Sequence, residues 1–176
     1  MTQPDRVYLD TSFFIGLHEN QSGNRELFTK ILHWERKRGS QLFTSQLTVN
    51  EYLVRYYDKH KRDEDCEKHV REAERDIYSI ASVYGISDEV CRKAARYMSV
   101  WGELRRMPDP KLPRDRGFRW DAIHLATADT IKVARVYVRD GPWKDFPKEE
   151  LGNIGELVCP PRLLEPQADL PMELST

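Results

Sequence analysis

Short apolar runs alternate with amphipathic segments along this chain of 176 residues. The runs "RVYL" (6–9) and "QLFTS" (41–45) are typical of short strands. Between them, "RELFTKILHWERKRGS" places apolar residues at helical spacing and closes with basic residues and Gly39, which predicts a helix. The same patterns predict further helices over 12–20, 48–62, 63–78, 87–106 (with Ser87 as N-cap) and 120–132, and further strands within 80–86, 134–140 and 156–161.

The alternation of strands and helices favours an α/β fold with a mainly parallel sheet and helices on both faces. A chain of this length usually forms one domain, which we place over residues 1–164, with 165–176 as a frayed C-terminal tail. Sites in open parallel sheets form at the carboxyl ends of the strands. Residues that directly follow a strand are therefore the first candidates for function.

The composition indicates a soluble protein with a highly charged surface but little net charge. Charged residues make up 32% of the chain, and the net charge is -1, so nucleic-acid binding would need a local basic patch. The three cysteines are far apart, which argues against a zinc site or a disulfide framework. The start lacks the apolar region of a signal peptide, and no apolar run approaches the ~20 residues that span a bilayer. We therefore expect reduced thiols and a cytoplasmic protein without a membrane segment.

Two predicted strands end in an aspartate. Asp10 follows "VYL" and Asp140 follows "VYVR", and if these strands are neighbours, both carboxylates point into the same region. Each has an ordinary structural alternative: Asp10 is a suitable N-cap for the next helix, and Asp140 with Gly141 forms a common turn. Asp145, five residues later, is a second candidate.

Two more acids lie on predicted helices. Glu51 lies at the edge of an apolar stripe made by Leu47, Leu53, Val54 and Tyr57; the alternative is a capping box with Thr48 as N-cap. Asp121 opens the small-residue helix "DAIHLATADTI", which we expect to be buried. A negative charge is favoured in the first turn of a helix for structural reasons alone. One turn later, His124 is expected to be packed and hydrogen-bonded rather than a ligand.

Four carboxylates gathered at one place would repel one another and raise their own pKa values. A hard divalent cation offsets this repulsion, and Mg²⁺ prefers oxygen ligands and retains several waters. Such a site can hold phosphate oxygens and activate water. The basic segment 105–119, with Arg114, Arg116 and Arg119, directly precedes Asp121; it is either a solvated loop or a guide for a phosphate backbone.

The ordered motifs resemble those of the PIN-domain ribonucleases, in particular toxins of the VapC type. The resembling segments are "YLDTSFFIGL", "LTVNEYL", "WDAIHLATA", "VYVRDGPWKDF" and "GELVCPPRLL", and together they cover roughly residues 7–164. The third is the most specific. In the fourth, Val138 stands where many relatives have Thr or Ser, and the loop after it is longer than usual.

The resemblance implies a three-layer α/β/α fold and metal-dependent cleavage of RNA. It implies that Asp10, Glu51, Asp121 and Asp140 bind one or two Mg²⁺ or Mn²⁺ ions, with Ser12 and Asp145 in support. It also implies an antitoxin partner and a homodimer.

Three alternatives remain open. A haloacid-dehalogenase-type phosphohydrolase usually needs a second Asp two residues after the first, where this chain has Ser12. The second alternative is an RNA- or protein-binding module without catalytic activity. The third is a nuclease of RNA maturation or decay that is not a toxin.

Overall fold

The computed structural model describes residues 3–18, 24–104, 118–139, 143, 146–159 and 161–162. Strands and helices alternate through most of this range, as the sequence predicts. The strands are β1 (Arg6–Leu9), β2 (Gln41–Ser45), β3 (Ser82–Tyr84), β4 (Arg135–Tyr137) and β5 (Glu156–Val158). The helices are α1 (Thr11–His18), α2 (Asn24–Lys37), α3 (Gln46–His60), α4 (Cys66–Ile80), α5 (Asp88–Leu104), α6 (Phe118–Ile131) and the short 3-10 helix η2 (Lys148–Glu150).

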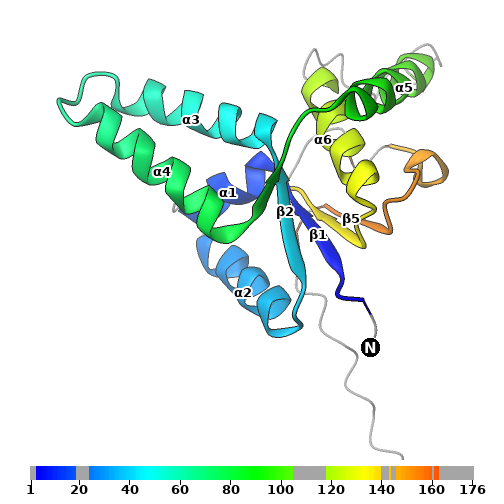
Figure 1. Ribbon diagram of the computed structural model, residues 1–176, viewed down its shortest axis with the longest axis horizontal. Coiled ribbons are helices and arrows are strands. Elements are labelled where there is room, and N and C mark those ends of the chain that lie inside the picture. Colours follow the sequence, from blue (N-terminus) through cyan, green and yellow to red (C-terminus); the bar gives the residue numbers. More distant parts are fainter. Residues whose placement is uncertain are drawn as a thin grey trace, which may run out of the picture.

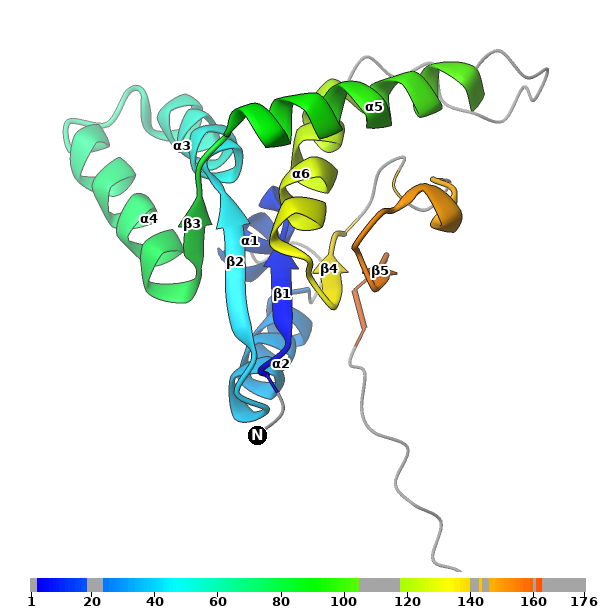
Figure 2. The same cartoon turned by 45° about the vertical axis from the view of Figure 1, so that its right-hand side comes forward.

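The five strands form one parallel sheet in the order β3-β2-β1-β4-β5. The first strand in the sequence is therefore the central one, with Val7 opposite Leu42 of β2 and Tyr8 opposite Val136 of β4. Because all strands run the same way, their carboxyl ends meet at one edge of the sheet, at the top in Figure 2. The adjacency of β1 and β4 confirms that the strands preceding Asp10 and Asp140 are neighbours.

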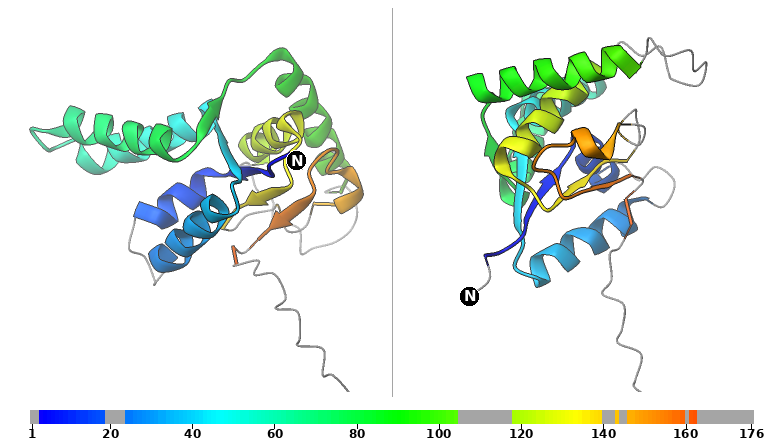
Figure 3. Two further views of the ribbon diagram at one scale, coloured as in Figure 1. Left: turned by 60° about the horizontal axis from the view of Figure 1, so that its bottom comes forward. Right: turned by 90° about the vertical axis from the view of Figure 1, so that its right-hand side faces the viewer.

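Two hydrophobic cores lie on opposite faces of the sheet. Tyr8 and Val136 face a core shared with α5 and α6, whereas Val7, Leu9 and Tyr137 face a core shared with α1, α2, α3 and α4. Successive strand residues alternate between the two faces because the side-chain period of a strand is two. The left-hand view of Figure 3 shows the strands between the α1–α2 pair and the α5–α6 pair. The predicted three-layer α/β/α fold is confirmed.

Helices α3 and α4 pack on each other and extend to one side of the sheet as a two-helix arm (Figure 1). The inner face of α4 buries Val70, Ala73 and Ile77. Along α3 only the first half is well buried, through Leu47, Thr48, Val49 and Tyr52. The predicted apolar stripe on this helix is therefore wrong in its second half: Val54 and Tyr57 are 53% and 42% exposed.

An ion pair between Glu35 and Arg135 joins α2 to β4 at the amino end of the sheet. Glu35 of α2 is fully buried and accepts two hydrogen bonds from the guanidinium of Arg135, at 2.9 and 3.0 Å. The hydroxyls of Ser40 and Tyr137 also donate to this carboxylate. These four donors satisfy a charge that would otherwise be costly in the interior.

Most predicted elements are confirmed, with shifted ends. Strand β4 is shorter than the predicted 134–140, and α6 begins at Phe118, two residues before the start of the predicted helix over 120–132. Ser87 caps α5 as predicted, because its hydroxyl accepts from the N–H of Val90. Gly39 has φ +75°, which allows the turn after α2. Among the described helices, none combines the length and apolar character needed to cross a bilayer.

Candidate active site

Asp10 lies in the loop between β1 and α1 and is buried. Its N–H donates to the carbonyl of Tyr137, which ties the end of β1 to β4. Its Oδ2 accepts from the N–H and the hydroxyl of Ser12, at 3.1 and 2.7 Å. Its Oδ1 lies 3.5 Å from Nε2 of His124. One oxygen therefore caps the helix while the other faces the interior, so the capping interpretation does not exclude a place in a cluster.

Ser12 has a second contact that fixes its hydroxyl. Its Oγ accepts a hydrogen bond of 2.8 Å from the N–H of Arg139, directly after the β4 segment. The hydroxyl of Ser12 thus links Asp10 to the segment that follows β4. Together with the bond from the N–H of Asp10 to the carbonyl of Tyr137, this contact connects the first acid to the chain just before Asp140.

Glu51 is not part of a capping box. The N-cap of α3 is Ser45, whose side chain accepts from the N–H of Thr48 at 3.1 Å, so the capping-box alternative with Thr48 as N-cap is wrong. Glu51 instead uses Oε2 to accept from the hydroxyl of Thr11 and to contact Nε2 of His124 at 3.1 Å. Burial alone would raise the pKa of Glu51, but the hydrogen bond and charge of His124, with the Thr11 hydroxyl, outweigh it and lower the pKa.

Asp121 lies in the first turn of α6, which is buried as predicted. Its Oδ1 accepts a hydrogen bond of 2.9 Å from the indole N–H of Trp143. Burial, followed by the nearby charge of Asp10, raises the pKa of Asp121 to about 7, and the Trp143 hydrogen bond offsets only part of this. The carboxylate therefore lies in a place where a further negative charge is unfavourable.

His124 stands at the centre of these contacts and is almost completely buried. Its Nδ1 lies 2.7 Å from the hydroxyl of Tyr8 and 3.3 Å from that of Ser45. The prediction of a packed, hydrogen-bonded histidine is confirmed. Burial alone would lower the pKa of His124, but the charges of Asp10, Glu51 and Asp121 outweigh it and raise the pKa.

The remaining predicted site residues are only partly placed. Asp140, Asp145, Arg114 and Arg116 lie outside the described residues. Arg119 lies on the first turn of α6 and is exposed, two residues before Asp121.

Three contacts were not predicted. Trp143 hydrogen-bonds Asp121, Thr11 hydrogen-bonds Glu51, and Tyr8 hydrogen-bonds His124. The sequence shows in advance only that Asp121 and His124 lie one helical turn apart.

The acid cluster (Asp10, Glu51 and Asp121) has the donor chemistry that a hard divalent cation requires. All three offer carboxylate oxygens. Burial, followed by the nearby charge of Asp10, raises the pKa of Asp121, and a bound cation would offset both by stabilising the ionised carboxylate. Mg²⁺ is usually held by one or two carboxylates with several waters. The three carboxylates therefore need not all contact the ion directly, because bound waters can bridge the remaining distance. In the described part of the chain, one group of three or more His, Cys, Asp or Glu residues has its potential ligand atoms all within 4.8 Å of one another. It lies outside the acid cluster and consists of His60, Asp63 and His69.

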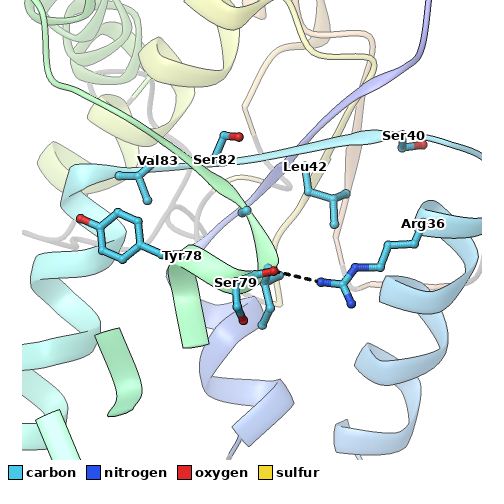
Figure 4. A pocket seen from close by; sticks show the side chains of 9 residues that line it. Arg36, Ser40, Leu42, Tyr78, Ser79, Ser82 and Val83 are labelled. Carbon is cyan, nitrogen blue, oxygen red and sulfur yellow. Dashed lines mark hydrogen bonds between the residues drawn. The ribbon is translucent and has the colours of Figure 1, made fainter. Parts of the chain in front are cut away.

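A surface cavity of about 430 Å³ lies at the amino end of the sheet, away from the acid cluster. Its lining includes Leu42 of β2, Tyr78 at the end of α4 and Val83 of β3. Figure 4 shows the guanidinium of Arg36 donating to the carbonyl oxygen of Ser79 there. None of the described residues that line this cavity carries a carboxylate, so the acid cluster and the cavity lie at different ends of the sheet.

Several solved structures share the fold. VapBC2 from Rickettsia felis, bound to a DNA fragment from its promoter, aligns with a TM-score of 0.59 and 12% identity over 88% of this chain and 98% of that chain. VapBC-1 from nontypeable Haemophilus influenzae aligns with a TM-score of 0.58 and 15% identity over 85% and 94%. The Sarcin-Ricin loop cleaving toxin VapC20 from Mycobacterium tuberculosis aligns with a TM-score of 0.52 and 16% identity over 79% and 93%.

The sequence itself also carries a family assignment. No curated protein sequence matches the chain significantly, but the family model of the PIN domain matches residues 7–149. This range contains Asp10, Glu51, Asp121 and His124, and the five-stranded parallel sheet agrees with it. The chain belongs to the PIN domain family.

Proposed function

We propose that the chain is a divalent-metal-dependent endoribonuclease and the toxin of a toxin–antitoxin pair. The observation that supports this most is the convergence of Asp10, Glu51 and Asp121 around His124 at the carboxyl edge of the sheet. Family membership supports a nuclease, and the carboxylates are hard donors suited to Mg²⁺ or Mn²⁺.

Asp10, Glu51, Asp121 and Asp140 would hold one or two ions, with Asp145 in support. A bound divalent ion supplies a Lewis acid that polarises the phosphate and makes water easier to deprotonate. The chain's own residues fix the carboxylates: Ser12 holds Oδ2 of Asp10, and Trp143 holds Oδ1 of Asp121. Such fixed ligands lower the cost of assembling the site.

The substrate would be held beside Asp121. Arg119 is exposed there, and with Arg114 and Arg116 it would attract the phosphate backbone. Trp120, between Arg119 and Asp121, is 54% exposed. An exposed indole next to an acid site offers a surface on which an unpaired base stacks.

The toxin assignment rests on the fold neighbours. The structures from Rickettsia felis and Haemophilus influenzae are of VapBC pairs, and by this analogy we propose an antitoxin partner, a homodimer and a cytoplasmic location. Co-expression tests this part: the product of a small adjacent gene should bind the chain and restore growth. Cleavage without any such partner would leave the nuclease of RNA maturation as the better assignment.

Cleavage of labelled RNA tests the chemistry. Tag-free protein should cut single-stranded or structured RNA with Mn²⁺ or Mg²⁺ and lose this activity in EDTA. Restoring the metal should restore the cutting. If no RNA is cut and Mn²⁺ does not bind, the binding-module alternative becomes the better one.

A further inference from the structure

A second group of potential ligands lies at the tip of the α3–α4 arm, beyond Glu51 on α3. His60 is the last residue of α3, Asp63 lies in the turn after it, and His69 lies in the first turns of α4. One ring nitrogen of each histidine and one oxygen of Asp63 all lie within 4.8 Å of one another. Figure 1 shows this turn at the outer end of the arm.

The backbone of the turn holds these residues in place. The N–H of Asp63 donates to the carbonyl of His60 at 2.8 Å, and the N–H of Cys66 donates to that of Asp63 at 3.2 Å. The N–H of His69 donates to the carbonyl of Asp65 at 3.1 Å. The three side chains therefore come from the two helix ends and the hydrogen-bonded turn between them.

The three side chains already contact one another, and the two rings must turn out of their stacked arrangement for a nitrogen of each to point at one ion. Nδ1 of His60 lies 2.6 Å from Oδ2 of Asp63, and the rings of His60 and His69 stack with centroids 4.4 Å apart. The ring of Tyr56 supports His60 at 5.7 Å. Nδ1 of His69 lies 4.0 Å from a carboxylate oxygen of Glu72, which is beyond hydrogen-bonding distance.

The donor set selects the kind of ion. Two imidazoles and one carboxylate suit Zn²⁺, Ni²⁺ or Co²⁺, whereas Mg²⁺ requires oxygen ligands and is poorly held by nitrogen. With bonds of 2.0–2.1 Å, tetrahedral ligands are about 3.3 Å apart. The His60–Asp63 contact must therefore open slightly, and the exposure of Asp63 and His69, 49% and 39% of their side chains, leaves room for this.

We propose that His60, Asp63 and His69 bind one divalent transition-metal ion, preferably Zn²⁺, and that the ion joins α3 to α4 at the tip of the arm. The fourth position is open to water. The site does not depend on the acid cluster, and it stabilises the hairpin whose first helix carries Glu51. Because the ion binds the folded turn only, it raises the stability of the protein.

Metal titration of tag-free, metal-stripped, full-length protein tests the proposal. In the presence of excess Mg²⁺, Co²⁺ should bind one to one and give a visible absorption band, and Zn²⁺ should displace it. At a hundredfold excess over Kd, Zn²⁺ should raise Tm by about 5–10 °C. No binding of Zn²⁺ or Co²⁺ by the wild-type chain overturns the proposal.

The variants locate the ion. His60→Ala, His69→Ala and the isosteric Asp63→Asn should each weaken Zn²⁺ binding, the histidine variants by about a hundredfold or more. His33→Ala, which removes an exposed histidine of α2, should bind Zn²⁺ like the wild type. The double variant Asp10→Asn, Asp121→Asn should also bind one Co²⁺ unchanged, whether or not the chain cuts RNA. Unchanged binding in folded His60→Ala and His69→Ala, or loss of binding only in the acid variant, contradicts the proposal.

Discussion

Nε2 of His124 lies 3.1 Å from Oε2 of Glu51, although 73 residues separate them in the sequence. This contact joins α6 to α3 across the carboxyl edge of the sheet. It gives Glu51 a partner at the edge of the core, where an unpaired carboxylate would be costly. The imidazole thus organises the acid cluster without being one of the acids.

The coupling of these two residues is the first prediction. In a double-mutant cycle, Glu51→Gln and His124→Gln should show a coupling energy of about 1–3 kcal/mol in urea unfolding, because they share one partly buried contact. Asp58→Asn, an exposed acid on the same helix, should add to His124→Gln within about 0.5 kcal/mol. Additivity in the Glu51 cycle would show that the contact carries no energy.

The indole of Trp143 is predicted to matter through its N–H. Trp143→Phe keeps a ring in the core but leaves Oδ1 of Asp121 without its donor, so the cleavage rate should fall by about 10–100-fold. Circular dichroism should show an unchanged fold. Trp34→Phe, on α2 and away from the acids, is the control and should cut RNA at the wild-type rate. Equal cleavage rates in the two variants would show that the N–H of Trp143 does not contribute to cleavage.

The ion pair of Glu35 and Arg135 should be a main source of stability at the other end of the sheet. Glu35→Gln leaves Arg135 partly unpaired in the interior, which typically costs about 3 kcal/mol. Urea unfolding should show this loss. Lys30→Ala breaks an exposed pair on the same helix and should leave the midpoint unchanged. A small effect of Glu35→Gln would mean that the carboxylate is not buried as described.

Two glycines should respond to alanine with opposite signs. A Cβ at Gly16 would clash with the ring of Phe28, where α1 packs on α2, so Gly16→Ala should lower Tm by several degrees. Gly102 lies within α5, and no atom of the described residues lies within 4 Å of the position that a Cβ would take there. Gly102→Ala should therefore stabilise by up to about 1 kcal/mol, because alanine favours the helix. Equal effects at both sites would contradict the packing of α1 against α2.

The sequence predicted the elements better than their contacts. The bounds of β1 and β2 agree with the runs "RVYL" and "QLFTS", because strand patterns are local. The cap of α3 was missed because Ser45 is also the last residue of β2, and Thr48 with Glu51 matches a capping box equally well. Val54 and Tyr57 are exposed because the second half of α3 leaves the sheet, which helical spacing cannot reveal.

The site was only partly predictable for a similar reason. Asp10, Glu51 and Asp121 were found as separate acids, and the order of the strands was needed to bring them together. The donors that fix them come from distant segments: Thr11 to Glu51 spans 40 positions, and Tyr8 to His124 spans 116. No local pattern encodes such pairs, since they depend on which strands lie side by side.

The most direct test of the central claim compares two acids in one assay. Asp121→Asn removes a charge from the acid cluster, and Asp58→Asn removes an exposed one from the arm. With RNA and Mn²⁺, Asp121→Asn should cut at least about a hundredfold more slowly than Asp58→Asn, which should match the wild type. Equal cleavage rates in two folded variants would contradict the assignment of the acid cluster as the nuclease site.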